Sequence, residues 1–258
     1  MEKNDIEYLE KVQANSKLQD VLKYSRDNHI PTMLTNTGKL LYKYVKKLQP
    51  KSILEIGTAI GYSGIVMLTA TENKSHLVTV EKDENRVKMA KDNFFECNLQ
   101  ENVTVVQGDA SQVVNDIYSQ LANNDINLLV ENQQNNTIDT KSQSSSTIDH
   151  NENKSQNDGL IDFNENKSQK FDFIFLDGSK SQYIKQIDML LGLLNDNGVI
   201  FIDDALYMYD VYKEGDVPHK HRAMIKNLRE FVKKILTLDN IDKRVFNYDE
   251  GIIVLSKR

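Results

Sequence analysis

SILEIGTAIGYSG, residues 52–64, reads as a buried strand over 52–57, a glycine-rich turn and the start of a helix near Ser63. Glycines allow a tight turn with close approach of the backbone, and the free amide groups of a helix N-terminus can bind a ligand. Gly57 and Gly61 are spaced G-x-x-x-G, which departs from the G-x-G-x-x-G of dinucleotide-binding folds. The turn alone therefore predicts an α/β unit. Whether it binds a ligand or is only a tight turn remains open, with neither interpretation favoured.

Strands and helices alternate regularly on both sides of this stretch. We predict strands at 76–81, 103–109, 171–177 and 199–204, and helices at 84–97, 111–122, 180–194 and 220–236. Helices also occupy 1–49, where apolar residues recur every three or four positions. Apolar strands alternating with helices predict a parallel sheet covered on both faces. A final hairpin, 243–248 and 251–257, adds an antiparallel strand to this single domain of residues 1–258.

Composition bounds the class of protein. The chain has 258 residues and a net charge of −6, which argues against coating nucleic acid through bulk charge but leaves a local basic patch open. It has no run of ~18 apolar residues, so no membrane association through a span is predicted. The lone Cys97 excludes an intramolecular disulfide framework and a multi-cysteine zinc site. With no signal-peptide pattern at its start, the chain is predicted to be cytoplasmic.

A low-complexity insert at about 123–170 interrupts the alternation. It is rich in Asn, Gln and Ser, and IDHNENKSQ at 148–156 recurs as IDFNENKSQ at 161–169. Its few apolar side chains cannot offset the entropy of ordering it, and its repeats lack a face to stack. We interpret it as a disordered surface loop rather than a solenoid.

Acidic residues follow the predicted strands. Open α/β sheets bind ligands at the carboxyl ends of their strands. Glu81 follows the second strand and suits the two hydroxyls of a ribose, while Asp109 follows the third, where an adenine amino group could lie. Either acid alone could be a helix cap, as Asp83 could be. Together with the glycine turn, they predict an adenosyl-binding site.

Three further aspartates close the next two strands. Asp177 follows the fourth strand, and Asp203 and Asp204 follow the fifth. Adjacent strands lie ~4.8 Å apart, so these carboxylates should converge and repel one another unless a cation such as Mg²⁺ binds them. Lys180 lies one helical turn beyond Asp177 and is a candidate general base with a pKa lowered beside a metal. The alternatives are an aspartate that caps a helix and an exposed lysine.

Five stretches at these positions resemble the cation-dependent O-methyltransferases that use S-adenosylmethionine, the group of the catechol and caffeoyl-CoA enzymes. They are LEIGTAIGYS (54–63), VEKD (80–83), GDA (108–110), FIFLDGSKSQY (173–183) and VIFIDDAL (199–206). IPTMLTNTG (30–38) and LEIGTAIGYS look most like the bacterial branch that methylates 5-hydroxyuridine in tRNA, giving 5-methoxyuridine. The resemblance implies a Rossmann-like class I methyltransferase fold with a seven-stranded sheet.

The resemblance also implies roles for individual residues. Met33, Ser63 and Gly57 would contact the cofactor, Glu81 the ribose, and Asp109 with Ala110 the adenine. Asp177, Asp203 and Asp204 would bind Mg²⁺, and Asp177 would also contact the cofactor and act in catalysis beside Lys180. The chain departs from the family where Asp204 replaces the usual asparagine, and in the insert, which has no counterpart. A homodimer is a further expectation.

The substrate is the least determined feature. Lys220, His221 and Arg222 follow the predicted metal-site loop and could meet tRNA phosphates, although a solvated basic helix face explains them as well. Tyr207, Tyr209 and Tyr212 could stack on a base or line a pocket for a phenol. A tRNA hydroxyuridine methyltransferase is the leading hypothesis, followed by a methyltransferase of a catechol-like small molecule and then by a non-enzymatic adenosyl-binding protein.

Overall fold

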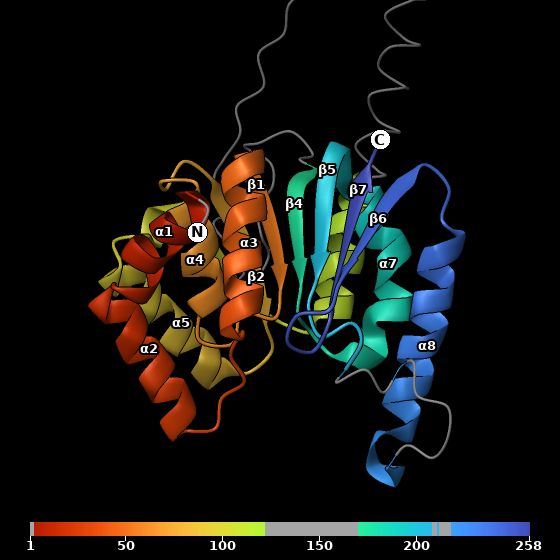
Figure 1. The fold of residues 1–258 in the computed structure, drawn as a ribbon, viewed down its shortest axis with the longest axis horizontal. Helices are drawn as coiled ribbons and strands as arrows, with labels where there is room; N and C mark the ends of the chain where they lie inside the picture. Colours follow the sequence, from red (N-terminus) through yellow and green to blue (C-terminus); the bar gives the residue numbers. More distant parts are fainter. Residues whose placement is uncertain (1–2, 122–169, 208–210, 212–217) are drawn as a thin grey trace, which may run out of the picture.

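A computed structural model describes residues 3–121, 170–207, 211 and 218–258 (Figure 1). The proposed disordered insert lies outside these residues, apart from its last position, as do Tyr209 and Tyr212. None of the helices in the described segments is long and apolar enough to cross a membrane.

The described strands form one sheet with the order β3-β2-β1-β4-β5-β7-β6. The first five are parallel, β7 runs antiparallel to β5, and β6 pairs antiparallel with β7. The predicted seven-stranded sheet with its terminal hairpin is therefore confirmed. The strands are β1 (Ser52–Ile56), β2 (His76–Glu81), β3 (Val103–Gln107), β4 (Phe171–Leu176), β5 (Leu194–Ile202), β6 (Ile241–Phe246) and β7 (Ile252–Lys257).

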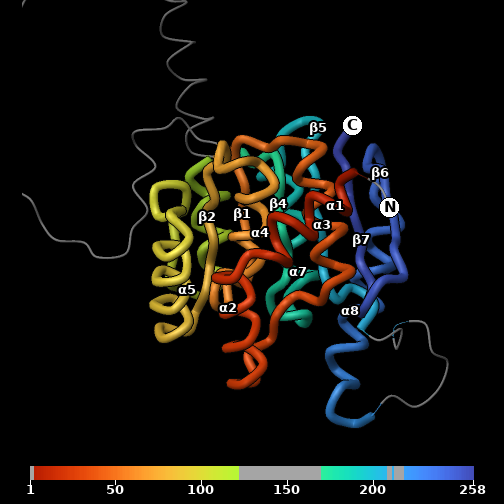
Figure 2. The backbone as a smooth tube through the Cα atoms, turned by 60° about the vertical axis from the view of Figure 1, so that its left-hand side comes forward, coloured from red at the N-terminus to blue at the C-terminus, as the bar shows by residue number. Residues whose placement is uncertain are grey.

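Helices cover both faces of this sheet, because successive strand side chains point to opposite sides. Leu54 and Ile56 belong to one apolar cluster, and Ile53, which directly precedes Leu54, belongs to the other. The first cluster packs against the helix at 110–121, α7 (Tyr183–Gly192) and α8 (Arg222–Thr237). The second packs against α1 (Lys3–Tyr8), the π-helix η1 (Leu9–Gln13), α2 (Ser16–Asp27), α3 (Thr35–Leu48), α4 (Tyr62–Ala70) and α5 (Glu84–Glu96). Figure 2 shows the tube of the N-terminal helices from the side.

Element boundaries differ from the sequence expectation mainly around β5 and α7. The helix expected at 180–194 divides into a 3-10 turn, η4 (Lys180–Gln182), and α7, while β5 begins at Leu194 instead of 199. Asn197 at φ 63° and the irregular pairing between Phe171 and Phe173 show that the chain turns within the start of β5. Residues 195–198 at the start of β5 are polar or glycine, so the apolar pattern that predicts a strand starts only at Val199.

Candidate functional site

Strand register brings the predicted site residues into one row. Ile56 pairs with Val80 on one side and with Leu176 on the other, and Leu176 pairs with Ile202. The residues that follow these positions therefore lie side by side at the carboxyl edge of the sheet. They border a pocket of about 480 Å³. Nine predicted site residues line it, namely Met33, Gly57, Glu81, Asp109, Ala110, Asp177, Lys180, Asp203 and Asp204.

Gly57 allows the loop after β1 to approach the end of β4 closely. Its φ is +104°, a region that other residues rarely adopt. A Cβ at this position would lie 2.4 Å from the Asp177 carbonyl oxygen, which belongs to backbone and cannot swing away. Glycine is therefore required here for two independent steric reasons.

The Glu81 side chain is held in place by backbone amides. One carboxylate oxygen accepts hydrogen bonds from the amides of Lys82 and Asp83, both at 3.0 Å, and the other accepts from the amide of Ala59, also at 3.0 Å. The alternative was that Glu81 caps the following helix. Asp83 has that role instead, because its side chain accepts a hydrogen bond from the Arg86 amide. Glu81 thus remains available to bind ligand hydroxyls at the pocket wall.

Asp109 directly precedes the helix at 110–121, which follows β3. Its carboxylate accepts from the amides of Ser111 at 2.9 Å and Gln112 at 3.3 Å, so it caps the helix while lining the pocket with Ala110. Asp109 can cap the helix and bind a ligand at the same time, because each carboxylate oxygen has two lone pairs.

Ser63 does not line the pocket. It is buried and donates its hydroxyl proton to the Glu55 carboxylate at 2.5 Å. Thr79 donates to the other carboxylate oxygen of Glu55 at 2.6 Å, and Thr58 lies 2.6 Å from the Thr79 hydroxyl. Glu55 was missed by the sequence analysis, although a lone acid inside the apolar strand SILEIG was the signal that could have found it.

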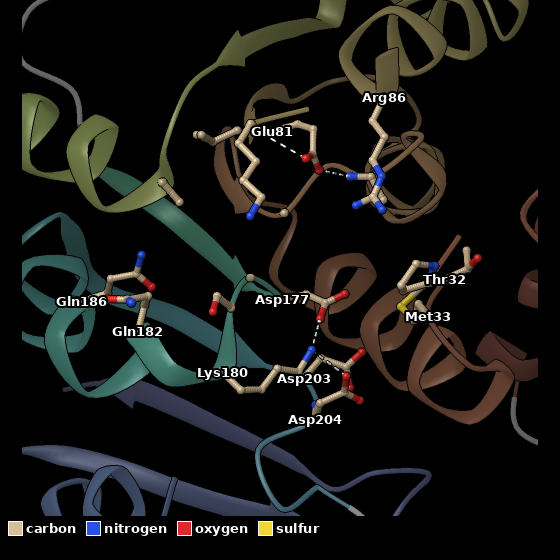
Figure 3. A pocket seen from close by; sticks show the side chains of 18 of the residues that line it. Thr32, Met33, Glu81, Arg86, Asp177, Lys180, Gln182, Gln186, Asp203 and Asp204 are labelled. Carbon is tan, nitrogen blue, oxygen red and sulfur yellow. Dashed lines mark hydrogen bonds and ion pairs between the residues drawn. The ribbon is translucent and has the colours of Figure 1, made fainter. Parts of the chain in front are cut away.

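The acidic cluster at the other end of the pocket is arranged around Lys180 (Figure 3). The ammonium lies 3.1 Å from Asp177 and 2.7 Å from Asp204. Asp203 is only 3% exposed and accepts a hydrogen bond from the amide of Asp204 at 2.8 Å. Lys180 is therefore the counter-cation of this cluster and not an exposed residue at the start of a helix.

Burial and mutual repulsion shift the titration of these groups. Burial and the charge of Asp204 raise the pKa of Asp177 to about 6, although Lys180 opposes this. The pKa of Asp203 is raised for the same reasons, with Asp177 as its strongest like-charged neighbour. Burial alone would lower the pKa of Lys180, but the surrounding negative charges raise it overall. The lowered pKa expected for Lys180 beside a bound metal stays a prediction, because here the carboxylates act directly on the ammonium.

The donor chemistry of this cluster suits a hard divalent cation. Three carboxylates lie near one ammonium, which contacts two of them, and this leaves an excess of negative charge that an oxygen-ligated cation would neutralise. Across the described part of the chain, however, no three acidic, histidine or cysteine side chains are arranged as a ready metal-binding group. The expected convergence is therefore only partial: the aspartates share one edge, with Lys180 between two of them.

Glu250 was also missed by the sequence analysis. It lies in the turn between β6 and β7 and lines the pocket. Burial first, and then the charge of Asp204, raise its pKa. The turn is positioned by backbone hydrogen bonds, since the amides of Ala205 and Leu206 donate to the carbonyls of Gly251 and Glu250. No sequence pattern places a hairpin turn beside a distant strand end.

The predicted basic residues lie outside the pocket lining. Lys220 and His221 are in the 3-10 turn η5 (His219–His221), and Arg222 begins α8. His221 Nδ1 is 3.4 Å from the hydroxyl of Tyr207, and the two rings are 5.4 Å apart. The amide of Tyr207 in turn donates to the carbonyl of Asp204 at 3.3 Å. The basic segment, Lys220 to Arg222, is thereby connected to the acidic loop, which carries Asp203 and Asp204.

Comparison with known proteins identifies the family. The family model described as O-methyltransferase matches residues 10–140 and 131–258. Among curated proteins, a catechol O-methyltransferase from Niastella koreensis is 34% identical over 79 residues, which is 31% of this chain and 36% of that protein. That alignment thus spans about a third of the length of the relative.

Solved structures share the fold. A Staphylococcus aureus protein provisionally described as a caffeoyl-CoA O-methyltransferase superposes with a TM-score of 0.69 and 21% identity, covering 99% of this chain and 98% of that one. An O-methyltransferase from Bacillus cereus, in complex with S-adenosylhomocysteine (SAH), gives a TM-score of 0.67 and 21% identity over 95% and 91% of the two chains. At these identities the likeness concerns the fold.

Proposed function

This chain belongs to the O-methyltransferase family, and on that premise we propose that it transfers the methyl group of S-adenosylmethionine (SAM) to a hydroxyl oxygen. The observation that carries the proposal is the division of one pocket into two ends. Glu81 and Asp109 line one end with carboxylates suited to ribose hydroxyls and an adenine amino group, and Asp177, Lys180 and Asp204 line the other. The row of strand ends connects them.

The cofactor supplies an activated methyl group, so the protein mainly has to align it with a nucleophilic oxygen. Gly57 lets the loop after β1 lie directly against Asp177 at the pocket lining, since a Cβ there would meet the Asp177 carbonyl oxygen. Glu81 is preorganised by three backbone amides and needs little rearrangement to accept ribose hydroxyls. Both features act before any chemistry and favour binding of an adenosyl ligand in one orientation.

Asp177, Asp203 and Asp204 would hold a divalent cation, which would supply a Lewis acid that lowers the pKa of a substrate hydroxyl. Lys180, adjacent to two of these carboxylates, is the candidate base that takes the hydroxyl proton at Nζ. For that role it must lose the proton that the carboxylates now stabilise. Asp177 and Asp204 would stabilise that proton less when they hold a cation.

For the substrate, we favour the 5-hydroxyl of 5-hydroxyuridine in tRNA. The contact of His221 with Tyr207 supports it, because it connects the exposed Lys220 and Arg222 to the acidic loop within reach of a nucleic acid backbone. The second candidate is a catechol-like small molecule, supported by the similarity to the Niastella koreensis enzyme. The third candidate is an adenosyl-binding protein without activity. The acidic cluster argues against it, because binding alone would not need these carboxylates.

The test uses methyl-labelled SAM, purified protein and Mg²⁺ with two acceptors in parallel. One is tRNA from cells that hydroxylate uridine but lack 5-methoxyuridine, and the other is a panel of catechols. Label in 5-methoxyuridine supports the tRNA proposal, and label in a catechol alone supports the second candidate. No label in either acceptor, from protein that binds SAH, would favour the non-enzymatic alternative.

A further inference from the structure

Arg86 is a cation on the pocket wall that has no part in the proposed methyl transfer. It lies in the first turn of α5, which Asp83 caps, and helical side chains tilt toward the N-terminus of their helix. Its half-buried side chain therefore extends over the pocket between Glu81 and the Thr32–Met33 segment (Figure 3). Within the described residues, the guanidinium has no hydrogen-bond or ion-pair partner.

The other cations of the pocket are less suited to an anionic ligand group. Only Lys82, Arg86 and Lys180 are cationic among its described lining residues. Lys180 lies between two carboxylates, and Lys82 is exposed. Two hydroxyl groups on the Met33 side are already used as donors: Thr32 donates to the Ile30 carbonyl and Thr37 to Asp249. Arg86 thus offers unused donors where the neighbours do not.

The charges of the cofactor determine which group would meet this cation. SAM carries a sulfonium, an α-ammonium and an α-carboxylate. Carboxylates line both ends of the pocket, so repulsion alone does not place the cofactor carboxylate. The guanidinium of Arg86 does, because it can bind a carboxylate through two parallel hydrogen bonds, whereas Lys180 already lies between two aspartates. The carboxylate is therefore expected on the Arg86 side of the pocket.

We propose that the guanidinium of Arg86 binds the α-carboxylate of SAM and so fixes the amino-acid end of the cofactor. This inference rests on the proposed function, because it requires SAM or SAH as the ligand. It makes Arg86 a cofactor-binding residue in addition to those that the sequence predicted. It also assigns the adenosine hydroxyls to Glu81 and the carboxylate to a different side chain of the same wall.

Calorimetric titration of the purified protein in the absence of any methyl acceptor tests the proposal. SAM and decarboxylated SAM differ only in the carboxylate, so each variant is titrated with both. We expect Arg86→Gln to weaken SAM binding roughly ten- to hundredfold and decarboxylated SAM less than about threefold. Arg86→Lys should recover part of the loss, because it keeps the charge but not the paired donors.

Lys88→Gln is the matched control, since it removes one positive charge from an exposed position of the same helix. It should leave both affinities unchanged. Equal weakening of both ligands by Arg86→Gln would assign the side chain to the adenosine half and overturn the proposal, as would no weakening of either. Failure of the unmodified protein to bind SAM and SAH would instead overturn the proposed function. A melting curve for each variant verifies that it is folded.

Discussion

The carboxylate of Asp249 binds the first turn of α3 through Thr37, 212 residues earlier in the chain. It accepts hydrogen bonds from the Thr37 amide at 2.8 Å and the Thr37 hydroxyl at 3.0 Å, and a third from the Asn36 side chain at 3.0 Å. Leu34, at the N-cap position of α3, makes no side-chain cap of its own. A residue of the C-terminal hairpin therefore caps the helix that follows the Met33 segment.

Asp249→Ala should lower the free energy of unfolding by about 1–2 kcal/mol, the range for loss of a helix cap. It should also weaken SAH binding, because the segment before α3 lines the pocket. Urea denaturation and calorimetry measure the two effects. Asp116→Ala, at an exposed helical position, is the control and should change stability by less than about 0.5 kcal/mol. Equal stability of the two variants would contradict the capping role.

Glu55 predicts a pH dependence of stability. Burial raises its pKa from 4.5 to about 7, although hydrogen bonds from Ser63 and Thr79 oppose the shift. Between these values the folded protein holds a proton that the unfolded chain has released, so this contribution to stability is complete below about pH 4.5 and is lost as pH rises through 7. The loss amounts to about 3 kcal/mol.

Glu55→Gln should remove that part of the pH dependence, because an amide does not titrate and Thr79 can accept from it while donating to Thr58. The measurement is the unfolding free energy at intervals from pH 4.5 to 8 for both proteins. Glu101→Gln, at an exposed position, should follow the unmodified protein. Curves for Glu55→Gln and the unmodified protein that stay parallel would show that folding leaves the pKa of Glu55 unchanged.

The sequence predicted the parts of the site that follow strands. Apolar strands have a recognisable pattern, and parallel pairing brings their ends together, so Glu81, Asp177 and Asp203 could be placed from order alone. Glu250 and the cap by Asp249 could not, because they depend on where the hairpin packs. Ser63 was assigned to the cofactor by resemblance, but its hydroxyl donates to the buried carboxylate of Glu55. From the sequence, Glu55 was treated only as part of an apolar strand.

Substitutions of Lys180 can distinguish its role as general base from its role as counter-cation of the aspartates. Lys180→Arg retains a cation for Asp177 and Asp204 but cannot accept a proton near neutral pH. We expect a 10²- to 10⁴-fold loss of methyl transfer with stability nearly unchanged. Lys180→Met should lose activity as well as stability, since it leaves the carboxylates without their cation. Activity of Lys180→Arg within threefold of the unmodified protein would contradict the base role.

Asp203 provides the test of the metal-assisted reaction. Because it is buried among like charges, its pKa is raised, and Asp203→Asn should leave the fold equally stable or more stable. We expect the same change to abolish methyl transfer while SAH still binds, since Asp203 lies at the end of the pocket opposite Glu81. Chelator should likewise abolish transfer by the unmodified protein, and Mg²⁺ should restore it. Full activity of Asp203→Asn in metal-free buffer would mean that the aspartates serve only to hold Lys180.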